Sequence, residues 1–127
     1  MTNELKKQCD LLFMVALQGI SNEDGKPVPE REAVSTLTGV FAGPSITCVE
    51  YNVRYGVLCA VIHRMKEQGK TAAKMLLKAM QGTPVTEIPI TRNYNGKRVI
   101  NVTALKALGI LPKGDFLLGA ELVKTEK

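Results

Sequence analysis

The sequence predicts an α/β fold in which a layered, mostly parallel sheet is flanked by helices. Residues 11–17 and 56–62 are apolar runs of strand length without a charged residue, which is typical of strands covered on both faces. Segments with helical spacing of apolar residues follow these runs, so strands and helices alternate along the chain. Since 45% of its 127 residues are hydrophobic and 23% are charged, we expect residues 1–127 to form a single α/β domain.

The first strand is expected at residues 11–17, after a short helix that ends near Gln8. Residues 19–29 predict a loop, because they are rich in Ser, Asn, Asp, Gly and Pro. Residues 30–41 predict a helix that begins with acidic residues and ends before Gly43-Pro44. The apolar residues of this helix share one face: Ala33, Val34, Leu37 and Phe41.

Two further strands and an irregular segment are expected in the middle of the chain. Polar and apolar residues alternate over residues 45–50, which indicates a strand. Residues 51–55 show no regular period, and the apolar strand 56–62 follows them.

The segment from Gly69 to Met80 predicts an amphipathic helix. Gly82 suits a left-handed C-terminal cap, and Pro84 prevents the helix from continuing. Lys70, Lys74 and Lys78 recur every four residues on the face expected to be exposed to solvent. The opposite face is expected to be buried, and it comprises Ala72, Ala73, Leu76, Leu77 and Met80.

The remainder of the chain predicts a hairpin, two short helices and a last strand. Asn95-Gly96 separates two extended runs within residues 88–102, and this pair favours a β-hairpin turn. Asn101 is expected to cap a helix that ends at Gly109. Residues 112–118 predict another short helix, and residues 120–123 a terminal strand.

The sequence contains no recognisable catalytic, cofactor or metal motif. Its single histidine, His63, would need a partner in reach to act as a base, and Asp10 at the edge of another strand is the one candidate. No glycine spacing fits a phosphate-binding loop. The cysteines are too widely spaced for a zinc site, and we expect buried, unpaired thiols at Cys9, Cys48 and Cys59.

The charge and the N-terminus exclude two further classes. The net charge is +5, but the cations are scattered and not interleaved with aromatic residues, so no nucleic-acid partner is expected. The polar N-terminus resembles no signal peptide, and the apolar run 11–17 is too short to span a bilayer.

Several short motifs follow one another along the chain: Pro44-Ser-Ile46, Gly56-Val-Leu-Cys-Ala60, the Gly-x-x-Ala-Ala start at Gly69, Ile88-Pro-Ile90, Ile100-Asn101 and Ala104–Pro112. Their order resembles a family of ABC-transporter substrate-binding proteins. Two features differ from that family: residues 17–22 replace its Asp-Asn-Thr-like loop after the first strand, and a common acid is lacking near Arg64.

This resemblance implies a Rossmann-like half of a periplasmic-binding-protein fold, namely its C-terminal lobe and returning tail. It implies a small, amino-acid-like ligand, a membrane permease as partner and a periplasmic or extracytoplasmic location, while the lack of a signal peptide leaves a cytoplasmic location open. No catalysis and no cofactor are implied.

Ligands of open α/β sheets bind at the carboxyl ends of the strands. The residues expected to line that edge are Gln18, Ser21, Asn22, Glu50 and Tyr51. Two alternatives remain open at this point. Beside small-ligand binding, the chain could be a homodimeric interaction or sensor module in which copies exchange the apolar tail 110–118, or an unrecognised small enzyme.

Overall fold

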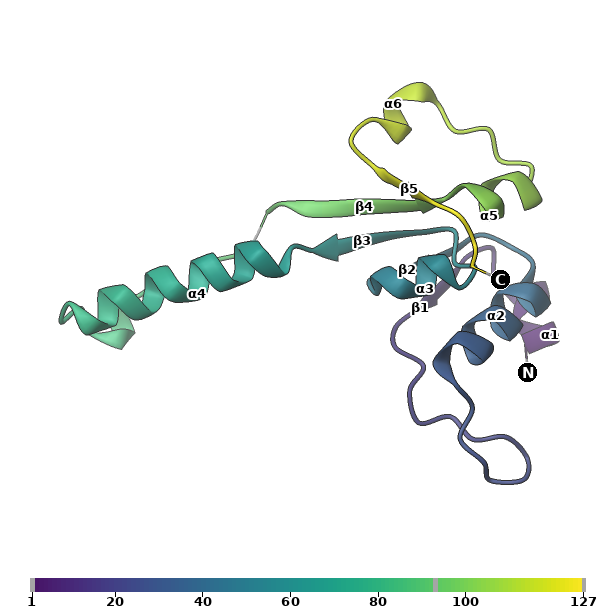
Figure 1. Cartoon of the computed structure of the whole chain (residues 1–127), viewed down its shortest axis with the longest axis horizontal. Helices are drawn as coiled ribbons and strands as arrows, with labels where there is room; N and C mark the ends of the chain where they lie inside the picture. Colours follow the sequence, from purple (N-terminus) through teal and green to yellow (C-terminus); the bar gives the residue numbers. More distant parts are fainter. Residues whose placement is uncertain (1, 93, 127) are drawn as a thin grey trace. The chain divides into compact units, whose positions relative to one another are not determined.

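The computed structural model describes residues 2–92 and 94–126, and these form two compact units (Figure 1). The larger, here called the sheet unit, comprises Met1–Ile62 and Arg98–Lys127. The smaller, called the helix unit, comprises His63–Lys97. Each unit is described separately below.

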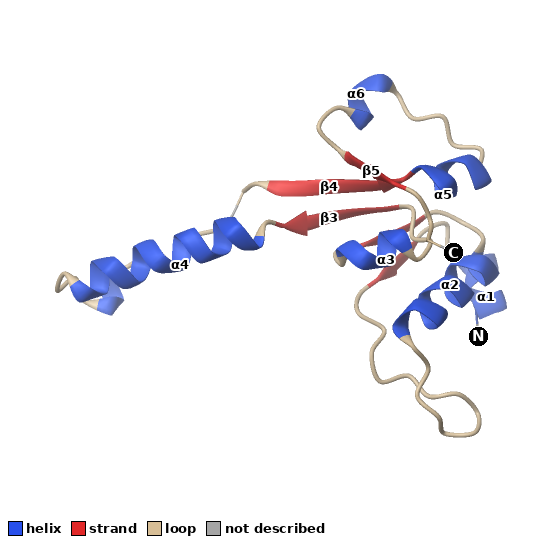
Figure 2. Cartoon of the chain, viewed as in Figure 1, coloured by secondary structure: helices blue, strands red, loops and turns tan. Residues whose placement is uncertain are grey.

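The sheet unit is built on five strands in the order β1-β2-β3-β4-β5. Strands are drawn in red in Figure 2. Adjacent strands are parallel in the pairs β1/β2, β2/β3 and β4/β5, whereas the arrows of β3 and β4 point in opposite directions in Figure 1. The predicted α/β fold with a mostly parallel sheet is thereby confirmed. The strands are β1 (Leu12–Met14), β2 (Ser45–Thr47), β3 (Cys59–His63), β4 (Gly96–Asn101) and β5 (Glu121–Val123).

Helices connect these strands, and their positions largely follow the sequence pattern. The predicted helix at residues 30–41 is confirmed as α2 (Glu30–Phe41), whose Val34 and Phe41 are buried as expected. The other helices of this unit are α1 (Thr2–Gln8), α3 (Glu50–Arg54), α5 (Val102–Ala107) and α6 (Gly114–Leu117). The irregular structure expected at residues 51–55 is wrong, because α3 is held by the complete burial of Asn52 and Val53 rather than by any local period.

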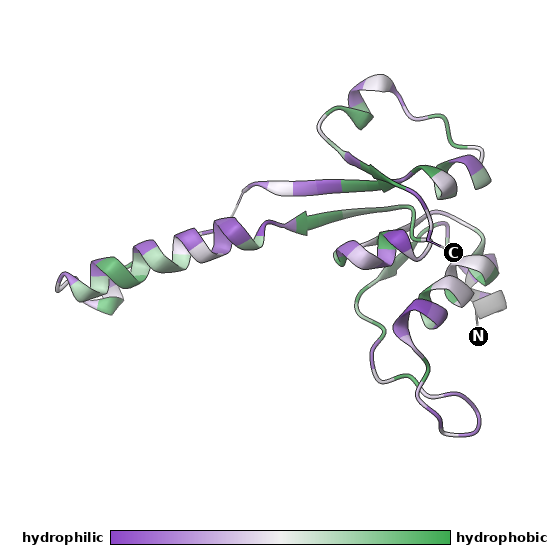
Figure 3. Cartoon of the chain, in the orientation of Figure 1, coloured by the Kyte–Doolittle hydropathy of each residue, from purple (hydrophilic) through white to green (hydrophobic). Residues whose placement is uncertain are grey.

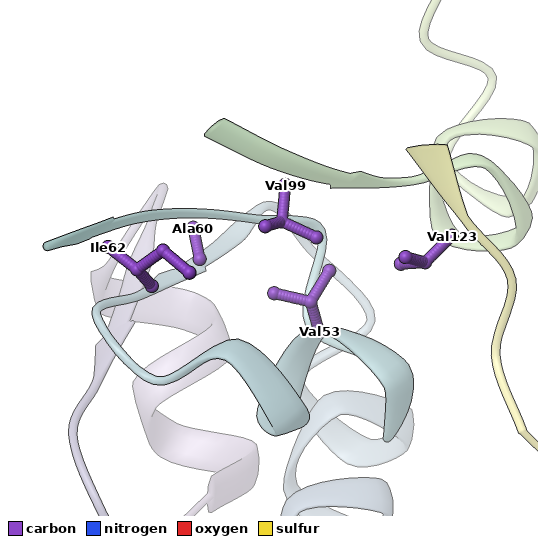
Figure 4. Close-up of a cluster of buried hydrophobic side chains, with 5 residues drawn as sticks. All are labelled: Val53, Ala60, Ile62, Val99 and Val123. Atoms are coloured by element: carbon purple, nitrogen blue, oxygen red, sulfur yellow. The ribbon is translucent and has the colours of Figure 1, made fainter. Parts of the chain in front are cut away.

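Two clusters of apolar side chains form the core of the sheet unit. The first joins α3 to the sheet, and its side chains converge in Figure 4: Val53, Ala60, Ile62, Val99 and Val123. The second joins Met14 of β1 to Val34 of α2 and to Val57. Full burial of a valine, isoleucine or methionine side chain contributes roughly 1.5–3 kcal/mol, so both clusters stabilise the unit.

The opposite face of the sheet is left open, which corrects the expectation of strands covered on both faces. Phe13 of β1 is 59% exposed and Val61 of β3 is 64% exposed. Parallel register places Phe13 beside Ile46 and Ile46 beside Cys59, so Phe13 and Val61 lie on one face of the sheet. The helices of the sheet unit therefore cover one side of β1 and β3 and leave an apolar surface on the other.

Asn101 joins three segments of the sheet unit, and its predicted role as an N-cap is confirmed. Its side-chain oxygen accepts the N–H groups of Thr103 and Ala104 over 2.9 and 3.1 Å. Its amide nitrogen donates to the carbonyl of Val53 over 2.6 Å and to the hydroxyl of Thr125 over 2.8 Å. Since Asn101 has no exposed surface, these bonds satisfy a fully buried polar group.

The helix unit consists of α4 (Met65–Met80), a 3₁₀ turn η1 (Val85–Glu87) and the segment that follows it. Gly82 has φ +94°, and the N–H of Thr83 donates to the carbonyl of Lys78, so the predicted glycine stop is confirmed. The hairpin expected at Asn95-Gly96 is wrong for the part of the chain described: residues 88–92 form no strand. Pro89 in this segment has no N–H to give to a ladder.

The predicted buried face of α4 is also wrong. Leu76 is 62%, Leu77 55% and Met80 75% exposed, and no residue of the helix is buried. The half-covered positions lie on another side of the helix: Glu67, Thr71, Met75 and Ala79. The amphipathic pattern is visible along α4 in Figure 3, but nothing in the helix unit covers its apolar side.

Candidate functional site

The candidate site is the edge of the sheet unit at which β1 and β2 end. Because the two strands are parallel, the chain leaves both of them at the same edge. Residues 15–18 continue from β1, and α3 begins three residues after the end of β2. Gln18 and Tyr51 thereby reach the same neighbourhood from positions far apart in the sequence.

A glutamate at the start of α2 holds this edge together. The carboxylate of Glu30 accepts the N–H of Leu17 over 3.0 Å and the hydroxyl of Tyr51 over 3.1 Å. Desolvation and the hydrogen bond to the Glu30 carboxylate raise the pKa of Tyr51 above its ordinary value of 10.0. Sequence reasoning did not include Glu30 in the site, since an acid in a first helical turn is already explained by the helix dipole.

Two of the predicted residues join this network and one lies beside it. Gln18 is exposed, and its side chain hydrogen-bonds Tyr51, which lowers the pKa of that phenol in opposition to Glu30. The ring of Tyr51 lies 5.8 Å from that of Tyr55, centroid to centroid, and is 38% exposed. Glu50 is half-buried as the first residue of α3.

Ser21 and Asn22 lie farther along the same loop and serve its own geometry. Ser21 forms a β-bridge with Pro27. The side-chain oxygen of Asn22 accepts the N–H groups of Asp24 and Lys26 over 3.1 and 2.8 Å. Such bonds are typical of asparagine in turns, so this oxygen is already engaged within the loop.

Asn52 is a further polar residue near this edge that the sequence did not reveal. It is fully buried, and its amide nitrogen donates to the carbonyl of Val15 over 3.4 Å. Its side-chain oxygen has no hydrogen-bond partner among the described residues. The contact joins α3 to the chain leaving β1, and it supports the loop that carries Gln18.

A groove of about 420 Å³ lies at the opposite edge of the sheet unit. Small and hydroxyl-bearing side chains line it, including Ser45, Gly56, Thr103, Ala107 and Thr125. The hydroxyl of Ser35 is engaged with the carbonyl of Tyr55 over 3.0 Å. This groove has no charged lining residue, so it suits apolar contact and not ionic recognition.

The residues weighed for other chemistry are not brought together. No cluster of three or more metal-ligating side chains occurs in residues 2–92 and 94–126. All three cysteines are free thiols, but the expectation that they are buried is wrong for Cys9 and Cys48, which are exposed. Partial burial raises the pKa of the Cys59 thiol. None of the described helices is both long and apolar enough to cross a membrane.

Three solved structures share this fold. One is the ligand-free, open structure of CD0873, a substrate binding protein with adhesive properties from Clostridium difficile (TM-score 0.69, 19% identity, 98% of this chain and 39% of that one). Another is an ABC domain in complex with L-Trp from Streptococcus pneumonia (0.66, 20%, 96% and 40%). The third is a conserved domain protein from Vibrio cholerae O1 biovar El Tor (0.64, 17%, 97% and 39%).

The fold gathers polar side chains where two parallel strands end, which is the edge at which open α/β sheets in general bind ligands. Residues 32–124 match the family described as ABC transporter substrate binding protein, and the chain belongs to that family. It spans about two fifths of the length of the three solved structures. A comparison with curated proteins gives no match.

Proposed function

We propose that this chain contributes one wall of a small-ligand site to an ABC-type transport or sensing system and does not catalyse a reaction. The observation that carries the proposal is the convergence of Gln18, Glu30 and Tyr51 at the end of β1 and β2. The ligand would meet this wall from the open side of the edge. A permease and an extracytoplasmic location belong to the same proposal, and they rest on membership of the family.

The chemistry of the edge favours an amino-acid-like ligand. Glu30 and Gln18 offer acceptors for an ammonium group, and the exposed ring of Tyr51 offers an apolar face. The solved structure in complex with L-Trp supports this choice of ligand class. The second wall of the site would come from the part of the fold that those longer proteins possess beyond the matched two fifths.

The test is calorimetric titration with the twenty amino acids, starting from L-tryptophan. Tyr51→Phe should weaken binding by about fivefold, because it removes the hydrogen bond, worth roughly 1 kcal/mol, that positions the Glu30 carboxylate for the ligand. Tyr94→Phe is the matched control, since Tyr94 lies in the helix unit and is 84% exposed. Absence of binding by every amino acid, or equal losses in both variants, would overturn the proposal.

The open face of the sheet unit favours a second function, that of a homodimeric interaction module. Phe13 and Val61 form an apolar surface that a second copy could cover, and Leu111 and Leu118 of the tail are 94% and 68% exposed. Light scattering over a dilution series should then show dimers that Val61→Lys dissociates. A chain that is monomeric at high micromolar concentration would exclude this function.

A further inference from the structure

A cationic cavity of about 470 Å³ lies within the helix unit, apart from the edge that carries Gln18 and Tyr51. It is formed along the first turns of α4, and Asn95 and Gly96 also line it. Lys66, Lys70 and Lys74 recur every four residues, so the helix places them on one side. Arg64, directly before the helix, adds a fourth cation.

The charges of this cavity are not balanced from within. Four cations face one carboxylate, that of Glu67, and no ion pair of the four occurs in the described part of the chain. The Oε1 of Glu67 accepts the N–H of Tyr94 and the side-chain amide of Asn95, both over 3.3 Å, whereas its buried Oε2 has no hydrogen-bond partner among the described residues. Like charges at four-residue spacing on a helix repel one another, so the arrangement is unfavourable until an anion enters.

The backbone at the start of α4 contributes positive potential, as do the cationic side chains beside it. Arg64 occupies the N-cap position, and its side chain has no acceptor with which to cap the helix. The backbone dipole therefore adds positive potential where Arg64, Lys66 and Glu67 line the cavity. The helix terminus supports the argument, but the four side chains around a cavity are what make the site.

We propose that this cavity binds a multiply charged phosphate-bearing group. Lysine recognises phosphate as a point charge, and arginine can bind two of its oxygens at once. A singly charged carboxylate would leave most of the four cations uncompensated, whereas a diphosphate would meet all of them. The group belongs either to a soluble small molecule or to a phospholipid headgroup. This inference is independent of the proposed amino-acid edge, because it concerns other residues and another ligand class.

The test titrates the full chain with inorganic pyrophosphate and follows backbone amide shifts by NMR. The shifts should centre on residues 64–74 and 94–96, and the Lys70→Gln/Lys74→Gln variant should bind at least about tenfold more weakly. Glutamine keeps the helix propensity of lysine, so α4 is retained, and circular dichroism checks this. The control is Lys106→Gln/Lys113→Gln, which removes the same charge from exposed positions of the sheet unit.

A parallel arm uses phosphatidylglycerol vesicles, with phosphatidylcholine vesicles as the neutral reference. If pyrophosphate binds and only the Lys70→Gln/Lys74→Gln variant loses this binding, the ligand is a soluble molecule. If phosphatidylglycerol vesicles bind and only this variant loses that binding, the ligand is a lipid headgroup. If neither probe binds at physiological salt, or if both double variants lose binding equally, the cations form no site and the proposal is overturned.

Discussion

The two units of the chain each contain an amphipathic helix with a clear apolar face, and only one of these faces is buried. In the sheet unit, Val34 of α2 is fully buried and Phe41 is 2% exposed. In the helix unit, Leu76 of α4 is 62% and Met80 75% exposed. The same periodicity therefore identifies a face that requires a cover, but it does not indicate whether the chain itself supplies that cover. In α2 the sheet supplies it, whereas α4 has none within its own unit.

Phe41 and Leu76 give the sharpest measurement of this difference, and the largest expected effect. Phe41→Ala should destabilise the sheet unit by about 3–5 kcal/mol, because it removes a buried ring and leaves a cavity. Leu76→Ala should change the free energy of unfolding by about 0.5 kcal/mol or less, as expected for an exposed position. Urea melts of both variants measure the contrast. A loss of about 2–5 kcal/mol at Leu76 would show that α4 is covered in solution.

Asn101 should produce an intermediate effect in the sheet unit. Asn101→Ala removes the cap of α5 and leaves the carbonyl of Val53 without its donor, so a loss of about 2 kcal/mol or more is expected. Thr125→Val is the matched control, since it removes one of the four bonds and keeps the side-chain shape. It should cost about 1 kcal/mol in the same melts. Equal losses would contradict the assignment of Asn101 as the residue that joins the three segments.

The smallest expected effect concerns the ionisation of Tyr51. Its pKa is raised in the folded chain, so the protonated phenol is favoured by folding, and this contribution is complete below pH 10 and lost as pH rises through the folded pKa. A difference spectrum between the wild type and Tyr51→Phe should therefore show a phenol that ionises above pH 10.0. In Glu30→Gln the same phenol should ionise at lower pH. An unchanged titration in that variant would contradict the contact with Glu30.

Elements that pack against other parts of the same unit could be predicted from local sequence signals. Alternation of strands and helices predicted the sheet, and residues 30–41 and Asn101 were assigned correctly because caps and periodicity are encoded nearby in the sequence. The candidate edge was predicted in part: Gln18 and Tyr51 do meet there. Glu30 was missed, because its position beside Tyr51 depends on tertiary folding across 21 residues.

The errors share a physical origin. The burial expected on both faces of β1 and β3, and on one face of α4, presumed covering layers that neither unit supplies for itself. Helix α3 was missed because its five residues are too few to show a helical period of apolar side chains. The burial of Val53 in the core stabilises this short helix. The hairpin was predicted from the turn preference of Asn95-Gly96 alone. The segment before this turn contains Pro89, which has no N–H to donate to a strand ladder.

The fourfold bonding of Asn101 also bears on how the fold tolerates insertions. The chain leaves the sheet unit after Ile62 and returns at Arg98, and Asn101 lies four positions into the returning segment. A slip of one residue would turn its side chain to the other side of β4 and break all four bonds at once. The register of β4 is therefore set by the hydrogen bonds of Asn101 and not by the length of the excursion, residues His63–Lys97. We expect the excursion to be a position where segments of other lengths can be exchanged while the sheet keeps its register.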